Sequence, residues 1–422
     1  MNDIPNSQPA PQFPKITEPN GLGTGPIPIE PYISPAWYAR EREQVFGRAW
    51  LCMGRVEQLP EPDTYIVKDI EICGAIALIT RDRAGTIRAF HNVCSHRANL
   101  VVAGPAGKAS RFVCKYHNWG YRNDGSCTSV PDRANFFNLD LKKCGLTPIA
   151  CDVWEGWIFI NLQKESEVSL REFLGELGEA FAGAPAPAAE HAFTIDVATM
   201  RANWKVTMDA FCESYHVPVL HPATVGATFA NAENPFSRPL NGKVRGIHRT
   251  LTTFGNPYYQ PPDDALVERL AYSSADTGNS LGADLTPEAK AALDHPAINP
   301  RKVPNWATEI VCLFPNFLLF YSPGGFFTLE FWPTSVNTTR WSAKIHVPRA
   351  ASVRQRFQQE HHNCRMAEIF LEDVGNLEQQ QRAMESGGKT EMHFQDGEFL
   401  LRHSFEMIQK WATAPSVRAA LA

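Results

Sequence analysis

The sequence lacks any continuous apolar run of 18 or more residues, so nothing in it predicts a membrane-spanning helix. It also lacks a basic excess: its formal net charge of -5 gives no reason to expect a nucleic-acid or anionic-membrane partner. The start, MNDIPNSQPAPQFPK, has no charged segment followed by an apolar stretch and does not predict a secretory signal. We therefore expect a cytoplasmic protein in which disulfides are rare.

The composition is that of a globular protein. Apolar residues make up 44% and charged residues 20% of the 422 positions, and this length predicts about two or three domains. Residues 1–35 are rich in Pro and Gly and predict a flexible N-terminal arm. Residues 36–49 predict a helix that packs on the domain formed by the later residues. Short apolar runs separated by turn residues make 50–165 a compact β domain, which leaves 166–422 for a second domain.

Within the second half, several segments have distinct patterns. Residues 180–190 predict a linker, and the polar, Pro-rich stretch 256–305 predicts an irregular excursion that covers a pocket. The run EIVCLFPNFLLFYSPGGFFTLEFWP, residues 309–333, predicts two buried strands around a Pro-Gly-Gly turn. Residues 351–385 predict one long helix.

Two Cys/His pairs occur in the β-rich first half. Cys94 precedes His96 by two positions, and Cys114 precedes His117 by three. Two thiolates and two imidazoles can bind zinc, or they can hold a Rieske [2Fe–2S] centre in which two histidines replace two cysteines on one iron. Zinc sites usually keep matched cysteine pairs, so the repeated order of one Cys and one later His favours the cluster. The remaining alternative is four unrelated buried residues.

A second cluster of polar residues follows at 203–222, NWKVTMDAFCESYHVPVLHP. On a helical wheel Asp209, Glu213 and His216 share one side. Pro218 then disturbs the helix, and a bent backbone can aim His216 and His221 at one point. The opposite, core-facing stripe would consist of Trp204, Met208, Phe211 and Tyr215.

The long predicted helix offers a third ligand for these two histidines. Asp373 lies within its apolar stripe, where a carboxylate is costly unless it is paired or bound to metal. His216, His221 and Asp373 would form a 2-His-1-carboxylate triad, which leaves open positions on a non-haem Fe(II). The alternatives are packed or capping histidines and an ordinary ion-paired acid.

Both motifs resemble those of one family. Cys94-Ser-His96-Arg97 and Cys114-Lys-Tyr-His117-Asn118-Trp119 resemble the Rieske loops of aromatic-ring-hydroxylating oxygenase α subunits. The resemblance implies that the two cysteines hold one iron and the two histidines the other. Asn118 departs from the usual Gly, which can alter packing over the cluster.

The stretch 203–221 resembles the mononuclear-iron motif of the same family, and Glu372-Asp373 resembles its late acidic pair. The fold implied is α+β: an all-β Rieske domain before a helix-grip catalytic domain, in which a curved antiparallel sheet wraps a long C-terminal helix. In the family an acid at the position of Glu213 bridges to a Rieske histidine of the neighbouring subunit, here His117. The alternative is that Glu213 orients His216 within its own chain, and Asp209 can support either network.

The function implied is that of a terminal oxygenase. It would use O2 and electrons from NAD(P)H, relayed by a reductase and in some systems a ferredoxin, to hydroxylate or dihydroxylate an apolar, aromatic small molecule. Assembly would be α3, or α3β3 with a small β subunit. The substrate cavity would be lined by phenylalanines, unless they are plain core: Phe314, Phe317, Phe320, Phe326 and Phe327.

Three other functions remain open from the sequence. A Rieske monooxygenase or demethylase that acts on a quaternary amine would share these ligands. A Rieske electron carrier without oxygenase activity would need only the first motif. A zinc-stabilised scaffolding protein would need no iron.

Overall fold

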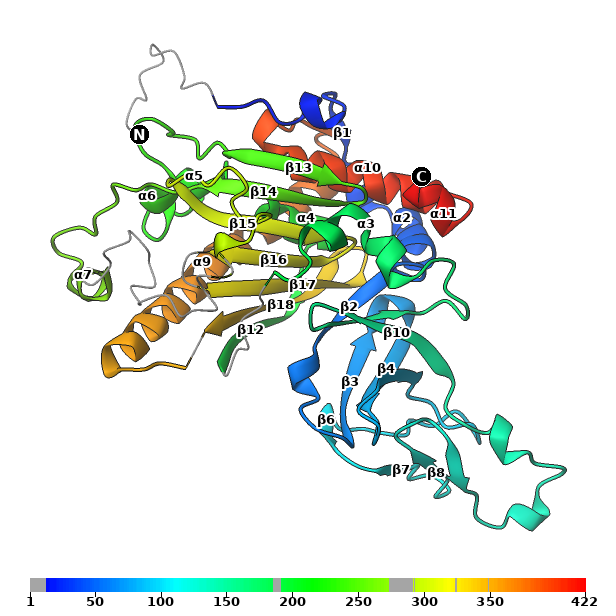
Figure 1. Cartoon of the computed structure of the whole chain (residues 1–422). Helices are drawn as coiled ribbons and strands as arrows, with labels where there is room; N and C mark the ends of the chain where they lie inside the picture. Colours follow the sequence, from blue (N-terminus) through cyan, green and yellow to red (C-terminus); the bar gives the residue numbers. More distant parts are fainter. Residues whose placement is uncertain (1–12, 185–190, 273–290, 292, 323–324, 348) are drawn as a thin grey trace. The chain divides into compact units, whose positions relative to one another are not determined.

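The structure is a computed structural model that describes residues 13–184, 191–272, 291, 293–322, 325–347 and 349–422. Two compact units divide the chain (Figure 1). The larger unit comprises the described parts of Met1–Ser34, Glu179–Phe331 and Val336–Met407, and the smaller unit comprises Pro35–Gly178, Trp332–Ser335 and Ile408–Ala422. In the described part of the chain, no helix combines the length and the apolar character needed to cross a bilayer.

The smaller unit is built from two antiparallel sheets. Its seven-stranded sheet has the order β2-β11-β10-β5-β4-β3-β6, and the second sheet has the order β7-β8-β9. The bounds of the first are β2 Trp50–Arg55, β3 Thr64–Ile70, β4 Ala75–Arg81, β5 Ile87–His91, β6 Ala106–Lys108, β10 Pro148–Trp154 and β11 Trp157–Asn161. The bounds of the second are β7 Arg111–Val113, β8 Gly120–Arg122 and β9 Cys127–Ser129.

One apolar cluster connects these two sheets. Leu78 and Phe90 come from β4 and β5, Phe112 and Tyr121 come from β7 and β8, and all four are buried with Trp119. Tyr65 of β3 meets the ring of Phe112 edge to face at 5.3 Å. The predicted β domain therefore has its own core, and both Cys/His pairs lie on loops held by that core.

The helical segment that follows the N-terminal residues belongs to this smaller unit. It consists of α2 (Pro35–Arg40) and the π-helix η2 (Glu41–Phe46), whose Val45 and Phe46 are fully buried. Its contacts group this segment with the β domain. The expected packing of residues 36–49 on the catalytic domain stays a prediction.

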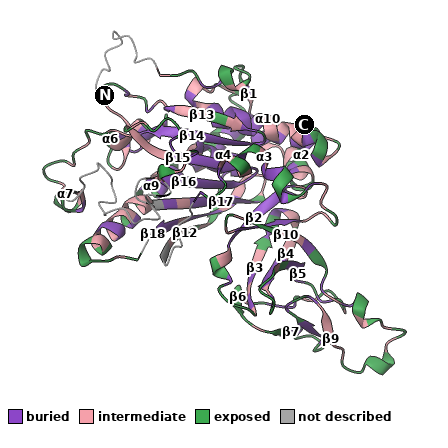
Figure 2. Cartoon of the chain, viewed as in Figure 1, coloured by how far each residue is buried: buried purple, intermediate pink, exposed green. Residues whose placement is uncertain are grey.

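The larger unit contains a seven-stranded antiparallel sheet in the order β12-β18-β17-β16-β15-β14-β13. The bounds are β12 His191–Met200, β13 Asn241–Arg245, β14 His248–Phe254, β15 Trp306–Leu313, β16 Phe317–Ser322, β17 Gly325–Ser335 and β18 Thr338–Val347. Figure 2 shows these strands largely buried. The run 309–333 thus forms parts of three strands rather than the two expected, because Pro315 and Asn316 make a further turn between β15 and β16. The expected turn residues Pro323 and Gly324 lie outside the described residues.

The long helix α9 (Val353–Glu385) lies against this sheet (Figure 1). It begins where the Ser352 side chain accepts a hydrogen bond from the Gln355 N–H, which caps its first turn. Its Phe370 packs edge to face on Trp341 of β18, with ring centroids 5.5 Å apart. A curled antiparallel sheet against a long C-terminal helix confirms the expected catalytic fold.

The segment that carries the first two predicted iron ligands is not one continuous helix. Helix α4 (Trp204–Asp209) continues as the 3-10 helix η7 (Ala210–Cys212), and Glu213 is extended. Short helices α5 (Val217–Leu220) and α6 (Gly226–Phe229) follow. We expected Tyr215 on the core face, but the break turns its side chain outward, where it is 48% exposed.

The described part of the expected flexible arm is packed in the larger unit. Residues 13–34 contain η1 (Glu18–Asn20), β1 (Ile27–Pro28) and α1 (Glu30–Ile33). Strand β1 pairs with β19 (Glu391–Met392), and the backbone N–H groups of Ile16 and Thr17 donate to the Asp396 carboxylate. The expectation of flexibility fails here because these hydrogen bonds and buried Ile16 and Tyr32 tie the segment down; residues 1–12 lie outside the described residues.

The remaining elements connect or cover these sheets. The helices are α3 Leu170–Ala180, α7 Leu266–Tyr272, α10 Phe399–Thr413 and α11 Val417–Leu421, and the 3-10 turns are η3 Val56–Gln58, η4 Glu71–Cys73, η5 Arg133–Asn135, η6 Leu141–Lys143 and η8 Asp396–Glu398. Most of the expected linker 180–190 and the central part of the excursion 256–305 lie outside the described residues.

Candidate metal centres and active site

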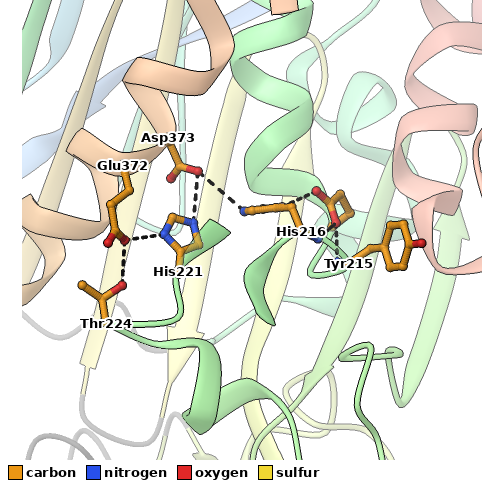
Figure 3. Close-up of polar contacts among 7 residues, drawn as sticks. Tyr215, His216, His221, Thr224, Glu372 and Asp373 are labelled. Carbon is orange, nitrogen blue, oxygen red and sulfur yellow. Dashed lines mark hydrogen bonds and ion pairs between the residues drawn. The ribbon is translucent and has the colours of Figure 1, made fainter. Parts of the chain in front are cut away.

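Three predicted ligands converge in the larger unit. His216 and His221 stand at the two ends of α5, and Asp373 reaches them from α9 (Figure 3). Nε2 of His221 lies 3.2 Å, and Nε2 of His216 3.6 Å, from Oδ1 of Asp373. One ligand atom from each residue falls within 4.8 Å of the other two, so the triad predicted from sequence forms a common point.

Each histidine is held from behind by a glutamate. Nδ1 of His221 donates to Oε2 of Glu372 across 2.6 Å, and Nδ1 of His216 donates to Oε1 of Glu213. Burial by itself lowers the pKa of His216, but the carboxylates of Glu213 and Asp373 outweigh this effect and raise it. Since both Nδ1 atoms are occupied, the Nε2 atoms are the ones presented to Asp373 and to a metal.

These donors fit a ferrous ion. The side chains of Asp373 and His221 are only 3% and 1% exposed, and a carboxylate so buried is costly without a cation. Two imidazole nitrogens and one carboxylate oxygen grouped on one side match the 2-His-1-carboxylate set that leaves positions open for oxygen and substrate. The chemistry that iron supplies at such a site is the activation of O2.

A cavity of about 140 Å³ opens beside His216 and Asp373. Its wall includes the carboxyl groups of Asp209, Glu213 and Glu398 and the side chains of Tyr32 and Phe394. The Tyr32 hydroxyl donates to Oδ2 of Asp209 across 3.0 Å. Burial raises the pKa of Asp209 to about 7 and that of Glu398 to about 7, so this wall carries exchangeable protons near neutral pH.

The phenylalanines expected to line the cavity lie elsewhere, four of them in strands β16 and β17 and Phe314 in the turn between β15 and β16. None of the five is among the residues that border the 140 Å³ cavity. Phe320 and Phe327 stack on each other with centroids 4.3 Å apart, and Phe326 stacks on the His346 ring at 4.4 Å. Their packing supports the plain-core alternative.

The smaller unit brings the four Rieske residues together at two neighbouring loops. Cys94 and Cys114 are buried, whereas His96 is partly exposed and His117 exposed, with their ring centroids 4.5 Å apart. In the part of the chain that the structure describes, only the triad of the larger unit forms a group of three ligand atoms within 4.8 Å. The spread of the Cys and His pairs argues against a single tetrahedral zinc and fits a cluster with two irons.

The protein surrounds the cysteine sulfurs with hydrogen-bond donors. Burial tends to raise the pKa of the Cys114 thiol, but the Tyr116 N–H and the Asn99 amide outweigh burial and lower it. The Tyr121 hydroxyl lies 3.1 Å from Sγ of Cys94. Asn118, the departure from the family pattern, has φ of 61°, a left-handed conformation that Asn tolerates better than most residues.

Two protein families match the chain. The family described as "Rieske [2Fe-2S] domain" matches residues 49–145, and that described as "Ring hydroxylating alpha subunit (catalytic domain)" matches 187–414, more than half of the chain. This chain therefore belongs to the Rieske ring-hydroxylating oxygenase α subunits. Membership implies a Rieske [2Fe–2S] cluster and a mononuclear iron as its cofactors.

Individual relatives match about half of the chain. Choline monooxygenase from Spinacia oleracea is 36% identical over 45% of this chain and 44% of its own length. The carnitine monooxygenase oxygenase subunit of Escherichia coli K12 is 29% identical over 46% of this chain and 52% of its own. The chain thus matches about half the length of these curated relatives.

Solved structures share the fold over nearly the whole chain. A quaternary ammonium Rieske monooxygenase bound to γ-butyrobetaine gives a TM-score of 0.67 at 18% identity, covering 92% of this chain and 95% of that one. Naphthalene 1,2-dioxygenase from Rhodococcus sp. bound to indole gives 0.72 at 21% identity, covering 93% and 95%. At these identities the likeness establishes the fold.

Sequence reasoning missed several residues around the triad. It gave Glu372 no role beyond the late acidic pair, yet Glu372 accepts from Nδ1 of His221 and from the Thr224 hydroxyl across 2.7 Å. Tyr32 and Glu398 join the cavity from distant parts of the chain. The adjacent Glu372-Asp373 pair was the one available signal, because neighbouring helical residues can contact two different atoms of one site.

Proposed function

We propose that this chain is the terminal oxygenase of a system that hydroxylates or demethylates a quaternary ammonium compound. The observation that carries the proposal is the acidic cavity beside the triad: Asp209 and Glu398 add carboxyl groups, and Tyr32 and Phe394 add aromatic rings. Carboxylates attract an alkylated ammonium cation. Each of the two rings already has a side-chain cation over it, Lys205 over Tyr32 and Arg402 over Phe394. The choline and carnitine monooxygenases among the relatives support the same substrate class.

Residues of this chain would bind the metal and orient the substrate. Glu213 and Glu372 hold the imidazoles so that Nε2 faces the metal, and Asp373 completes the ligand set. Asp209 and Glu398 would stabilise the positive charge of the substrate, with its methyl groups near the open metal positions. A cation in the cavity favours the ionised form of both acids, so substrate binding would release protons.

Electrons would enter through the Rieske cluster of a neighbouring copy. We propose a trimer, α3 or α3β3, in which Glu213 accepts a hydrogen bond from His117 of the next subunit. Glu213 already binds His216 and its backbone N–H, but a carboxylate has about four acceptor sites and keeps capacity for another donor. A separate reductase, with or without a ferredoxin, would deliver electrons from NAD(P)H.

A cytoplasmic location is part of the proposal. All ten cysteines are free, as a reducing compartment favours. The spinach relative carries the word chloroplastic in its name, which applies to that protein.

A substrate panel tests the proposed class. The chain, reconstituted with a Rieske-system reductase and NADH, is given choline or carnitine, a neutral analogue in which carbon replaces the ammonium nitrogen, and naphthalene. The proposal predicts O2 uptake coupled to product with a quaternary amine and uncoupled or absent uptake with the neutral analogue. Equal coupling with the neutral analogue would refute the proposal. Coupling with naphthalene alone would also refute it and would favour the aromatic substrate expected from the sequence.

A further inference from the structure

A chain of polar contacts connects His221 to a surface helix. Glu372 accepts from Nδ1 of His221 and, through the same oxygen, from the Thr224 hydroxyl (Figure 3). The Thr224 carbonyl accepts from Nη2 of Arg365. Nη1 of Arg365 pairs with Oε1 of Glu268 on α7 across 2.7 Å.

The outer end of this chain is shielded from water. The side chains of Arg365 and Glu268 are each 13% exposed, so their ion pair is screened far less than a surface pair. The Tyr259 hydroxyl donates to the same Glu268 oxygen across 2.7 Å. Removing either charge would leave the other partly buried without its ionic partner, which weakens the contact between α7 and α9.

Helix α7 reaches α9 through this pair and through further contacts, among them the edge-to-face rings of Tyr272 and His361. It has seven residues, too few to be stable alone, and Leu266, Val267 and Leu270 are exposed. Besides the Glu268 ion pair, its described attachments to α9 include a hydrogen bond from the Gln358 amide to the Ala271 carbonyl, 3.0 Å long. Arg365 therefore contacts both α7, through Glu268, and the turn at Thr224, through the Thr224 carbonyl.

We propose that Arg365 and Glu268 are positioning residues for the mononuclear iron site. Through Thr224 and Glu372 they hold His221 with Nε2 toward the metal, and metal binding in turn stabilises the docked position of α7. The coupling is reciprocal, because a contact network that favours one state at one end favours it equally at the other. The inference rests on His221 being an iron ligand, as in the proposed function, and is independent of the substrate.

Two measurements on the full-length holoenzyme test it. The first is the rate at which a ferrous chelator removes the mononuclear iron, with the visible absorbance of the cluster as an internal reference. Glu268→Gln and Arg365→Gln are expected to release iron roughly threefold to tenfold faster, below the effect of losing a direct partner of the ligand. Arg365→Lys, which keeps the charge, should release iron at a rate between those of the native enzyme and Arg365→Gln. Arg356→Gln is the matched control, because it breaks an exposed pair with Glu360 on the same helix.

The second measurement is backbone hydrogen–deuterium exchange over 266–272 before and after removal of the mononuclear iron. The native enzyme should show slower exchange with iron bound, and Glu268→Gln should lose this difference while keeping its thermal midpoint near native. Glu268→Gln is nearly isosteric, so it separates lost coupling from lost folding. Unchanged iron release in both Gln variants, or exchange in native α7 that ignores iron, would overturn the proposal. Neither readout uses a substrate, so failure here leaves the proposed function standing.

Discussion

Nε2 of His221 lies 3.2 Å from Oδ1 of Asp373, although 152 positions separate the two residues in the chain. His221 is supplied by the turn after α5 and Asp373 by α9, which packs on the sheet through Phe370. The catalytic fold thus brings a short loop and a long helix to one point. Both residues are buried, so water screens the negative charge of the Asp373 carboxylate poorly. The carboxylate therefore acts strongly on any cation that also contacts the two imidazoles.

Replacing Asp373 with Ala removes one ligand of three and the negative charge that offsets the metal. We expect turnover to disappear and the mononuclear iron to be lost, while the absorbance of the Rieske cluster persists. Iron content and O2 uptake check this. Glu378→Ala on the same helix, where the side chain pairs with exposed Arg201, should leave both unchanged. A fully active Asp373→Ala enzyme would place the third ligand elsewhere.

Glu213→Gln distinguishes an intersubunit bridge from an acid that only orients His216. If Glu213 carries the bridge, both metals stay bound and oxidation of the reduced cluster in a single turnover slows by roughly tenfold or more. Glu372→Gln is the matched comparison, because it removes the corresponding charge behind His221. We expect it to weaken iron binding with less effect on electron transfer. Equal behaviour of the two variants would remove the bridging role.

Asp209 makes stability depend on pH. Burial raises its pKa from 3.8 to about 7, so between about pH 4 and pH 7 the folded chain keeps a proton that the unfolded chain releases. Stability is therefore lost as pH rises through this window, by an upper bound of about 4 kcal/mol. The thermal midpoint of Asp209→Asn should fall less between pH 5 and pH 7 than that of the native chain. Asp263→Asn, at a fully exposed side chain, should follow the native profile. A native-like slope for Asp209→Asn would contradict this assignment.

Asn118 sits at φ of 61°, directly after the Rieske ligand His117. Replacement by Ala should cost about 1–2 kcal/mol, because a Cβ without a compensating polar group is disfavoured in the left-handed region. Asn118→Gly should be tolerated with the cluster intact. Denaturant unfolding monitored by cluster absorbance checks both, with exposed Lys115→Ala as the control in the same loop. Equal stability of the Ala and Gly variants would refute the conformational argument.

The sequence pattern was most informative where spacing alone encodes structure. Residues 351–385 predicted α9 closely, since a long periodic run has few alternative structures. A costly carboxylate in an apolar stripe and two histidines near Pro218 suggested the triad, and the resemblance to the family's mononuclear-iron motif favoured it over the alternatives. Each signal is local, so no distant contact had to be known.

The errors arose where particular side-chain contacts, local or distant, decide the conformation. The spacing of Asp209, Glu213 and His216 suits a helix, yet the chain breaks after Cys212 because the Glu213 carboxylate accepts from the His216 backbone N–H and ring. The hydrogen bond between Tyr32 and Asp209 joins residues 177 positions apart, and no local sequence pattern predicts it. For the same reason the N-terminal segment, rich in Pro and Gly, was expected to be flexible.

The central claim is that one chain assembles two separate iron centres, and the most direct test is iron and acid-labile sulfide analysis of one anaerobically purified sample. The account predicts about three irons and about two sulfides per chain, from a two-iron Rieske cluster and a single mononuclear ion. About two irons with about two sulfides, in protein reconstituted with excess ferrous ion, would mean that the chain holds the Rieske cluster alone. That result would favour an electron carrier and contradict the oxygenase. Zinc without sulfide would contradict both centres.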